Sequence, residues 1–408
     1  MAFDPANYFG FLLGGAEAAK LPLALLLVFG GAKLLNEIFE YFKQPGIIGE
    51  ILAGVLIGPT VLNWVQPNEV LTALAELGAM FLLFRVGLEV KVSELMKVGR
   101  TALIVAILGV VLPFMAGWGI MRLWGEPSVE SIFVGAAMVA TSVGITAQVL
   151  SAKGLLSHRA SQIILAAAII DDVLGLLVLA VVSGLAKGAV NFADLGMTIF
   201  IALTFTVVVA HFGARIAKRV VPILGGTLNA AEAQFNLALV HLFGLALLAV
   251  YAGVAAIIGA FLAGMAVGES VEHRVHDLSQ GITEFLTPFF LAGIGLHLDL
   301  QALNSADTML LAAVLVIAAV FSKMVGCGLG AWSLGKADML RIGAGMVPRG
   351  EVGMVVAQLG LTLGVISGPI YGVVVVMAIA TTMVAPPLLN LTYRDVTRGV
   401  PVEQFDVG

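Results

Sequence analysis

The run Ile163-Ile-Leu-Ala-Ala-Ala-Ile-Ile-Asp-Asp-Val-Leu-Gly-Leu-Leu-Val-Leu-Ala180 is apolar except for two adjacent carboxylates, Asp171 and Asp172. A run of this length and composition is typical of a membrane-spanning helix. A charged residue near the bilayer centre costs about 2.5–3.5 kcal/mol even on lenient scales, and such residues line ion paths or proton relays. A helix-packing hydrogen bond is the simpler explanation, but packing requires no second carboxylate. The pair therefore points to ion or proton movement.

Composition extends this interpretation to the whole chain. Of its 408 residues, 60% are hydrophobic and only 12% are charged, and the mean hydropathy is +1.05. Soluble domains carry about 25% charged residues, so a soluble protein is excluded. The net charge of −5 comes without a basic run, so nucleic-acid binding is not indicated. The single Cys327 excludes an intrachain disulfide. No nucleophile–base arrangement or nucleotide loop indicates an enzyme or a cofactor.

Apolar segments of roughly 20 residues recur from end to end. They predict an all-α polytopic membrane protein, one membrane domain with about thirteen transmembrane helices, each punctuated by glycine or proline. The expected spans are 19–42, 46–65, 70–90, 101–121, 130–151, 161–186, 195–214, 230–250, 253–268, 279–298, 308–332, 342–364 and 369–391.

Basic residues orient these spans. In the loops on the N-terminal side of the membrane we find only Lys20, Arg122 and Lys187, whereas the opposite set of loops, with the C-terminus, carries most of the others. The positive-inside rule then predicts an N-terminus outside the cell and a cytoplasmic C-terminus.

A buried cation and two interrupted helices accompany the aspartates. Lys323 lies several residues from either end of its span, where snorkelling to the interface is awkward, so we expect it to pair with an aspartate. The runs Ala140-Thr-Ser-Val-Gly-Ile-Thr-Ala-Gln148 and Gly345-Met-Val-Pro-Arg-Gly-Glu-Val-Gly353 predict two broken spans. Paired interrupted helices are the best sequence sign of a transporter binding site. The first run alone also fits a Ser/Thr packing patch.

The ordered motifs resemble the second cation/proton antiporter family, and most closely the bacterial sodium/proton antiporters with thirteen helices. The segments that carry the resemblance cover nearly the whole chain: Gln44–Pro59, Ala140–Leu150, Ile169–Leu176, Phe289–Leu300, Ser322–Ala331 and Pro348–Gly353.

The resemblance implies a homodimer in the bilayer of the inner (plasma) membrane. Each protomer would have dimerisation or scaffold helices at about 19–90 and 230–298, core helices at about 101–186 and 308–391, and a linker helix at about 195–214. The core would consist of inverted repeats with two crossed broken helices.

The resemblance also implies roles for individual residues. Asp172 would bind sodium or a proton, and Asp171 would pair with Lys323. Thr141 and Ser142 would lie at the first crossover. Arg349 and Glu351 would form a charge pair near the second.

The function expected from these features is sodium (or lithium)/proton antiport by alternating access, electrogenic if Lys323 releases its proton. A potassium/proton antiporter is the nearest alternative. Related glutathione-gated potassium efflux systems usually carry glutamine in place of the first aspartate, so Asp171 favours sodium. Alternatives of another class are an ion channel and a sodium-coupled symporter of organic anions.

Overall fold

The computed structural model describes residues 16–42, 44–186, 196–197, 200–202, 204–209, 212–213, 219, 232–298 and 305–397. Every regular element within these ranges is a helix, as the composition predicted. The helices are α2 (Ala16–Tyr41), α3 (Gly46–Ile57), α4 (Glu69–Glu89), α5 (Val92–Trp124), α6 (Ser128–Ala137), α7 (Val143–Ala152), α8 (Arg159–Ala186), α10 (Ala233–Tyr251), α11 (Ala256–Val267), α12 (His273–Leu296), α13 (Ala306–Gly330), η2 (Trp332–Leu334), α14 (Lys336–Gly345), α15 (Glu351–Thr362), α16 (Gly368–Thr392) and α17 (Arg394–Thr397).

Seven of the described helices are long and apolar enough to cross a membrane: α2, α4, α5, α8, α10, α13 and α16. The multi-pass architecture is therefore confirmed, while the count of thirteen stays a prediction. The span expected at 195–214 lies largely outside the described residues. One expected span is shorter in the structure, because α3 ends at Ile57 instead of continuing to residue 65. Gly58 and Pro59 follow directly, and the proline disfavours helical geometry in the residue before it.

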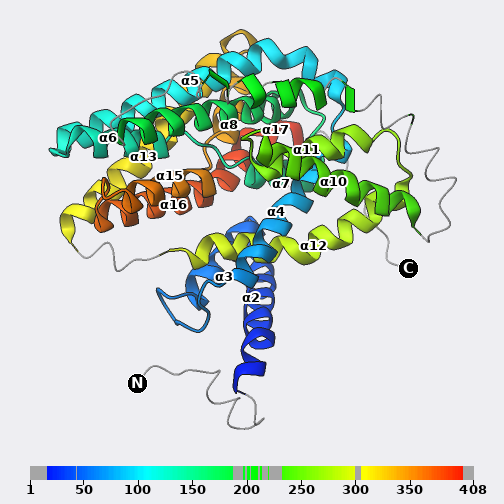
Figure 1. Cartoon of the computed structure of the whole chain (residues 1–408), viewed down its shortest axis with the longest axis horizontal. Helices are drawn as coiled ribbons and strands as arrows, with labels where there is room; N and C mark the ends of the chain where they lie inside the picture. The colour runs from blue at the N-terminus through cyan, green and yellow to red at the C-terminus, as the bar shows by residue number, and fades with distance from the viewer. Residues whose placement is uncertain are drawn as a thin grey trace.

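The helices pack in two groups, which Figure 1 shows on different sides of the molecule. The first group contains α2, α3, α4, α10, α11 and α12, and the second contains α5 to α8 and α13 to α17. In the first group, α4 packs against α11 and α12, and α3 packs against α2 and α12. In the second group, α5 packs against α6, α8 and α13. The buried aspartates and both interrupted helices therefore lie in the second group.

Backbone-to-backbone contacts hold the first group together. A Cβ atom added to Gly54 of α3 would lie 1.9 Å from the carbonyl oxygen of Ala292 in α12. A Cβ atom added to Gly264 of α11 would lie 2.1 Å from the carbonyl oxygen of Phe84 in α4. Small residues of this kind let helices approach closely where apolar burial alone gives little drive for association, as in a bilayer.

Two spans of the second group are interrupted where the sequence predicted a break. Helix α6 ends at Ala137 and α7 begins at Val143, while α14 ends at Gly345 and α15 begins at Glu351. In the second break, Pro348 lacks the backbone N–H that a continuous helix would need. The amide N–H of Ser142 donates to the carbonyl of Pro348 over 2.9 Å, so the two breaks meet. A Cβ atom on Gly350 would lie 2.6 Å from the Cβ atom of Ser142, which explains why glycine stands at this crossing.

Candidate functional site

A buried ion pair lies at the centre of the second helix group. The ammonium nitrogen of Lys323 in α13 is 3.0 Å from Oδ1 and 3.3 Å from Oδ2 of Asp171 in α8. Both side chains are 0% exposed. This places Lys323 where the sequence predicted an aspartate partner and excludes snorkelling to the interface. Breaking a buried pair of this kind by removing one partner is strongly destabilising.

Two backbone carbonyls complete the surroundings of the Lys323 ammonium. Nζ donates to the carbonyl of Gly109 in α5 and to the carbonyl of Val139 after α6, each over 2.7 Å. The three donor positions of an ammonium group are thereby filled by one carboxylate and two carbonyls. Val139 lies in the first break, where carbonyls lack the partners that a continuing helix would provide. The lysine therefore links the first break to the helix that carries the aspartates.

Asp172 follows Asp171 in α8 and is half-buried. Consecutive residues of an α-helix point about 100° apart, so the two carboxylates face different surroundings. The structure thus separates the two aspartates into a fully buried one and a more accessible one.

The polar run of the first break lies at the crossing. Thr141 and Ser142 are each 5% exposed. Ser142 contacts the second break through its backbone N–H, and the Thr146 hydroxyl donates to the carbonyl of Gly345 over 2.6 Å. The Thr141 hydroxyl is buried without a hydrogen-bond partner in the part of the chain that the structure describes. Thr141 therefore retains an oxygen that can serve as a ligand.

Arg349 fills the second break and is 0% exposed. Its backbone N–H donates to the Thr381 hydroxyl over 3.2 Å, and its carbonyl accepts from Thr382, both in α16. One guanidinium nitrogen donates to the carbonyl of Ala319 in α13 over 3.4 Å. Within the described ranges, Nε and Nη1 of Arg349 have no hydrogen-bond partner. The side chain of Glu351, its expected partner, lies outside the described residues.

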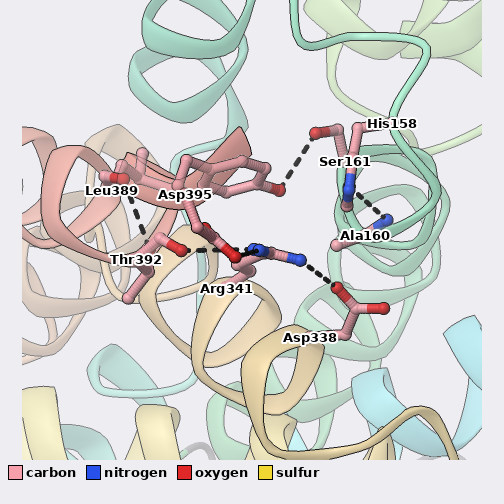
Figure 2. A network of polar contacts seen from close by, with 9 residues as sticks. His158, Ala160, Ser161, Asp338, Arg341, Leu389, Thr392 and Asp395 are labelled. Atoms are coloured by element: carbon pink, nitrogen blue, oxygen red, sulfur yellow. Dashed lines mark hydrogen bonds and ion pairs between the residues drawn. The ribbon is translucent and has the colours of Figure 1, made fainter. Parts of the chain in front are cut away.

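A second polar network ties the ends of α8, α14 and α16 together (Figure 2). Arg341 of α14 donates to Asp338 over 2.7 Å, to Asp395 of α17 over 2.5 Å and to the carbonyl of Thr392 over 3.2 Å. Its guanidinium also lies 5.5 Å from the ring centre of Tyr393. This network fixes the short α17 to the second helix group.

The same network reaches the first turn of α8. The Tyr393 hydroxyl is 3.0 Å from the Ser161 hydroxyl. Nδ1 of His158 accepts a hydrogen bond from the backbone N–H of Ala160 over 3.2 Å (Figure 2), so the neutral ring caps the helix that carries Asp171. Burial, followed by the positive charge of Arg341, lowers the pKa of His158, and the carboxylates of Asp338 and Asp395 act in the opposite direction.

A cavity of about 580 Å³ separates parts of the two helix groups. Its walls come from the N-terminal half of α4, the C-terminal half of α12, the connection between α10 and α11, α15, and the start of α16. We call this cavity the vestibule. Phe290 of α12 lines it and would contact a Cβ atom on Gly144, two residues beyond Ser142, at 3.4 Å. Met354, one turn beyond Gly350, also lines it. Two residues that line the vestibule, Phe290 and Met354, therefore lie near the crossing.

Several contacts in the site could not be predicted from side-chain types. Gly109 and Val139 bind Lys323 only through carbonyl oxygens, which every residue possesses. Thr381 and Thr382 resemble ordinary small residues of an apolar span, and only the fold brings them to Arg349. The sequence signal for these contacts was the position of Lys323 several residues inside a span, because a charged ammonium at that depth requires hydrogen-bond acceptors.

The interrupted helices that meet at a buried Asp171–Lys323 pair define a multi-pass membrane transporter of the broken-helix type. The sequence agrees, because residues 24–393 match the family model described as "Sodium/hydrogen exchanger, transmembrane". The chain belongs to this sodium/hydrogen exchanger family.

Similar curated proteins come from several organisms. The high-affinity Na(+)/H(+) antiporter NhaS3 of Synechocystis is 33% identical, covering 92% of this chain and 90% of the relative. The Na(+)/H(+)-K(+) antiporter GerN of Bacillus cereus is 33% identical, covering 91% of this chain and 95% of the relative. Among solved structures, the sodium proton antiporter MjNhaP1 of Methanocaldococcus jannaschii matches with a TM-score of 0.71 at 17% identity, covering 91% of this chain and 95% of that one. The structural match supports the fold.

Proposed function

We propose that this protein exchanges sodium or lithium ions for protons by alternating access. The observation that carries the proposal is the meeting of two interrupted helices beside the buried pair of Asp171 and Lys323, with Asp172 next in sequence. Such breaks bring partial charges of helix ends to membrane depth, where they can bind an ion. The relatives NhaS3 and GerN, both named as sodium/proton antiporters, support this choice of ions.

Asp172 is proposed as the shared site for the cation and the proton. Asp171 is fully buried in its ion pair with Lys323, whereas Asp172 is the more accessible of the two aspartates, and this greater access supports the assignment. Sodium is a hard cation, and one carboxylate does not replace its hydration shell. Thr141 and Ser142 are the proposed additional oxygen ligands, and the unpartnered hydroxyl of Thr141 supports this role.

The test of the shared site is Asp172→Asn, with Asp307→Asn as the matched control. Asp307 is an exposed acidic residue in the first turn of α13, away from the breaks. In proteoliposomes, Asp172→Asn should reconstitute and lose sodium-driven proton movement, while Asp307→Asn should retain it. Substantial exchange by Asp172→Asn would overturn the assignment. Competition for one carboxylate also predicts that apparent sodium affinity weakens as pH falls.

The stoichiometry is proposed to be two protons per sodium ion. If Lys323 stays charged, the sodium-loaded and proton-loaded sites both have zero net charge, and exchange moves no charge. If sodium binding separates Asp171 from Lys323 and the lysine deprotonates, the sodium-loaded site is −1 and the proton-loaded site is 0. Both side chains of the pair are fully buried, so loss of the Asp171 contact would leave the ammonium without a counter-charge, and this supports the second cycle. The reversal potential of wild-type exchange tests it, because electroneutral exchange would not respond to voltage.

Potassium/proton exchange is the second candidate. GerN is named for potassium as well as sodium, and a K(+)/H(+) antiporter of Saccharomyces cerevisiae is 29% identical over 96% of this chain and 49% of its own length. The aspartate at position 171 favours sodium over potassium. Proteoliposome exchange with sodium, lithium and potassium at one controlled potential distinguishes the two functions. A potassium/proton antiporter would respond to potassium at a lower concentration than to sodium or lithium.

We also propose the arrangement in the membrane. The first helix group would form the dimerisation scaffold (about 19–90 and 230–298), and the second would form the moving core (about 101–186 and 308–391), as two inverted repeats joined to the scaffold through a linker at about 195–214. The protein would be a homodimer in the plasma membrane with its N-terminus outside. The vestibule between the groups would then open outward. Crosslinking in native membranes tests the dimer, and labelling of single introduced cysteines tests the orientation.

A further inference from the structure

Glu76 places a carboxylate inside the vestibule. It lies on α4, seven residues after Glu69 and so about 10 Å along the helix axis at 1.5 Å per residue. Its side chain is exposed and lines the cavity. It forms no hydrogen bond or ion pair with another residue in the described ranges. An ionisable residue inside a membrane span is a functional candidate by default.

The walls around Glu76 are apolar and carry no lysine or arginine among the described lining residues. The remaining polar contributions come from Thr72, Gln358, Tyr371 and His297. Nδ1 of His297 already contacts the carbonyl of Gly293 in its own helix, 2.7 Å away. A cleft with low-dielectric walls and one sign of charge concentrates ions of the opposite sign. Glu76 therefore makes the vestibule attractive to cations.

The cavity that contains Glu76 is also lined by residues near the crossing of the breaks. Phe290 at the wall of the vestibule packs toward Gly144 of α7, and Met354 lies one turn beyond the second break. A cation held near Glu76 is thus in a cavity whose wall residues Phe290 and Met354 lie close to the breaks. The carboxylate lies on α4 of the first helix group, not on the group that holds Asp171 and Asp172.

We propose that Glu76 forms an accessory site for monovalent cations in the vestibule and sets the apparent cation affinity at one face of the membrane only. The inference rests on the proposed antiport. Glu76 is a positioning residue in this scheme, because it concentrates the cation near the site. The carboxylate proposed to exchange the cation for a proton, Asp172, lies in the second helix group. Since α4 and the rest of its group are proposed not to move, the accessory site serves only the state in which the vestibule is open.

The experiment compares Glu76→Gln with Glu69→Gln, which removes the same charge from an exposed position in the first turn of α4 that does not line the vestibule. Exchange is measured in right-side-out and everted membrane vesicles, with sodium varied at one face at a time. For Glu76→Gln we expect the KM for sodium to rise about fivefold or more at the face where the vestibule opens. The attraction between opposite unit charges about 4 Å apart in water corresponds to roughly that factor in affinity. The KM at the other face and the maximal rate should stay unchanged.

A relocated carboxylate separates an electrostatic role from a structural one. Thr72 lies one turn before Glu76 and also lines the vestibule. The double variant Glu76→Gln with Thr72→Glu should lower the raised KM again. Equal KM values for Glu76→Gln and Glu69→Gln, or an equal rise at both faces, would overturn the inference. Wild-type vesicles that show no cation/proton exchange would instead overturn the proposed function.

A measurement on the wild type remains decisive if Glu76→Gln does not reach the membrane. Added choline chloride screens charges in the vestibule, because the Debye length shortens from about 30 Å at 0.01 M to about 10 Å at 0.1 M. The KM for sodium at the vestibule face should therefore rise with choline chloride. A KM at that face that is independent of ionic strength contradicts the accessory site.

Discussion

The buried pair of Asp171 and Lys323 permits a double-mutant test of how strongly the core depends on it. Both side chains are fully buried, and Nζ of the lysine is 3.0 Å from the carboxylate. Removing one partner leaves the other charged group without compensation in the protein interior, at a cost of about 3–5 kcal/mol. Asp171→Asn and Lys323→Met should therefore each lower the free energy of unfolding by that amount. The double variant should lose much less than the sum, with a coupling of about 2 kcal/mol or more.

The assay is unfolding in mixed detergent micelles by titration with SDS, followed by tryptophan fluorescence. The pair of Arg85 and Glu89 is the control, because its atoms are 3.9 Å apart and its side chains are 28% and 38% exposed. Solvent screening should reduce the coupling of that pair to about 0–1 kcal/mol. Additive effects of Asp171→Asn and Lys323→Met, or a coupling no larger than the control value, would refute the reasoning that each buried charge is stabilised by the other.

Three further predictions concern the crossing and the network at the end of α8. Gly350→Ala should abolish exchange and lower stability, because the new Cβ would lie 2.6 Å from the Cβ of Ser142. Transport assays and SDS unfolding measure the two effects. A Gly350→Ala variant as active as the wild type would show that the breaks can separate without loss of function. Arg341→Gln should release α17 by removing the contact with Asp395. Amide hydrogen exchange at residues 394–397 should then become faster, and unchanged protection there would contradict the prediction. Because the pKa of His158 lies below its usual value of 6.5, its cap on α8 contributes stability that is present above pH 6.5 and lost as pH falls through the folded pKa. SDS unfolding of the wild type and His158→Ala across this pH range should converge at low pH, and parallel curves would contradict the cap.

The sequence predicted the interrupted helices because the responsible chemistry is local. Proline lacks an amide hydrogen and glycine lacks a Cβ, so Pro348 and Gly350 report a break wherever they occur in a long apolar span. The pairing of Lys323 with an aspartate was also predictable, since a buried ammonium requires an acceptor and few carboxylates lie at that depth. The family resemblance named Asp171 as that partner, and the structure shows the contact.

The rest of the site depends on contacts between distant parts of the chain. Lys323 binds the carbonyl of Gly109, which is 214 residues away in sequence and carries no side-chain signal. The hydroxyl contact between Ser161 and Tyr393 spans 232 residues, and neither residue type is unusual in a membrane protein. Glu50 of α3 accepts a hydrogen bond from the side-chain amide of Asn36 in α2 over 2.9 Å and lies 3.4 Å from the Lys33 ammonium. Such pairings follow from helix packing, which one sequence does not specify.

The glycine contacts of the first helix group limit how the protein can diverge. Helices α3 and α12 touch through Gly54, and α4 and α11 touch through Gly264, with no room for even a methyl group at either position. The spacing of these helices therefore cannot be adjusted by small steps, since the first step, glycine to alanine, already forces the backbones apart. Directed evolution toward another cation should accumulate its accepted substitutions around the breaks and the vestibule, and leave the glycine-lined helix faces unaltered.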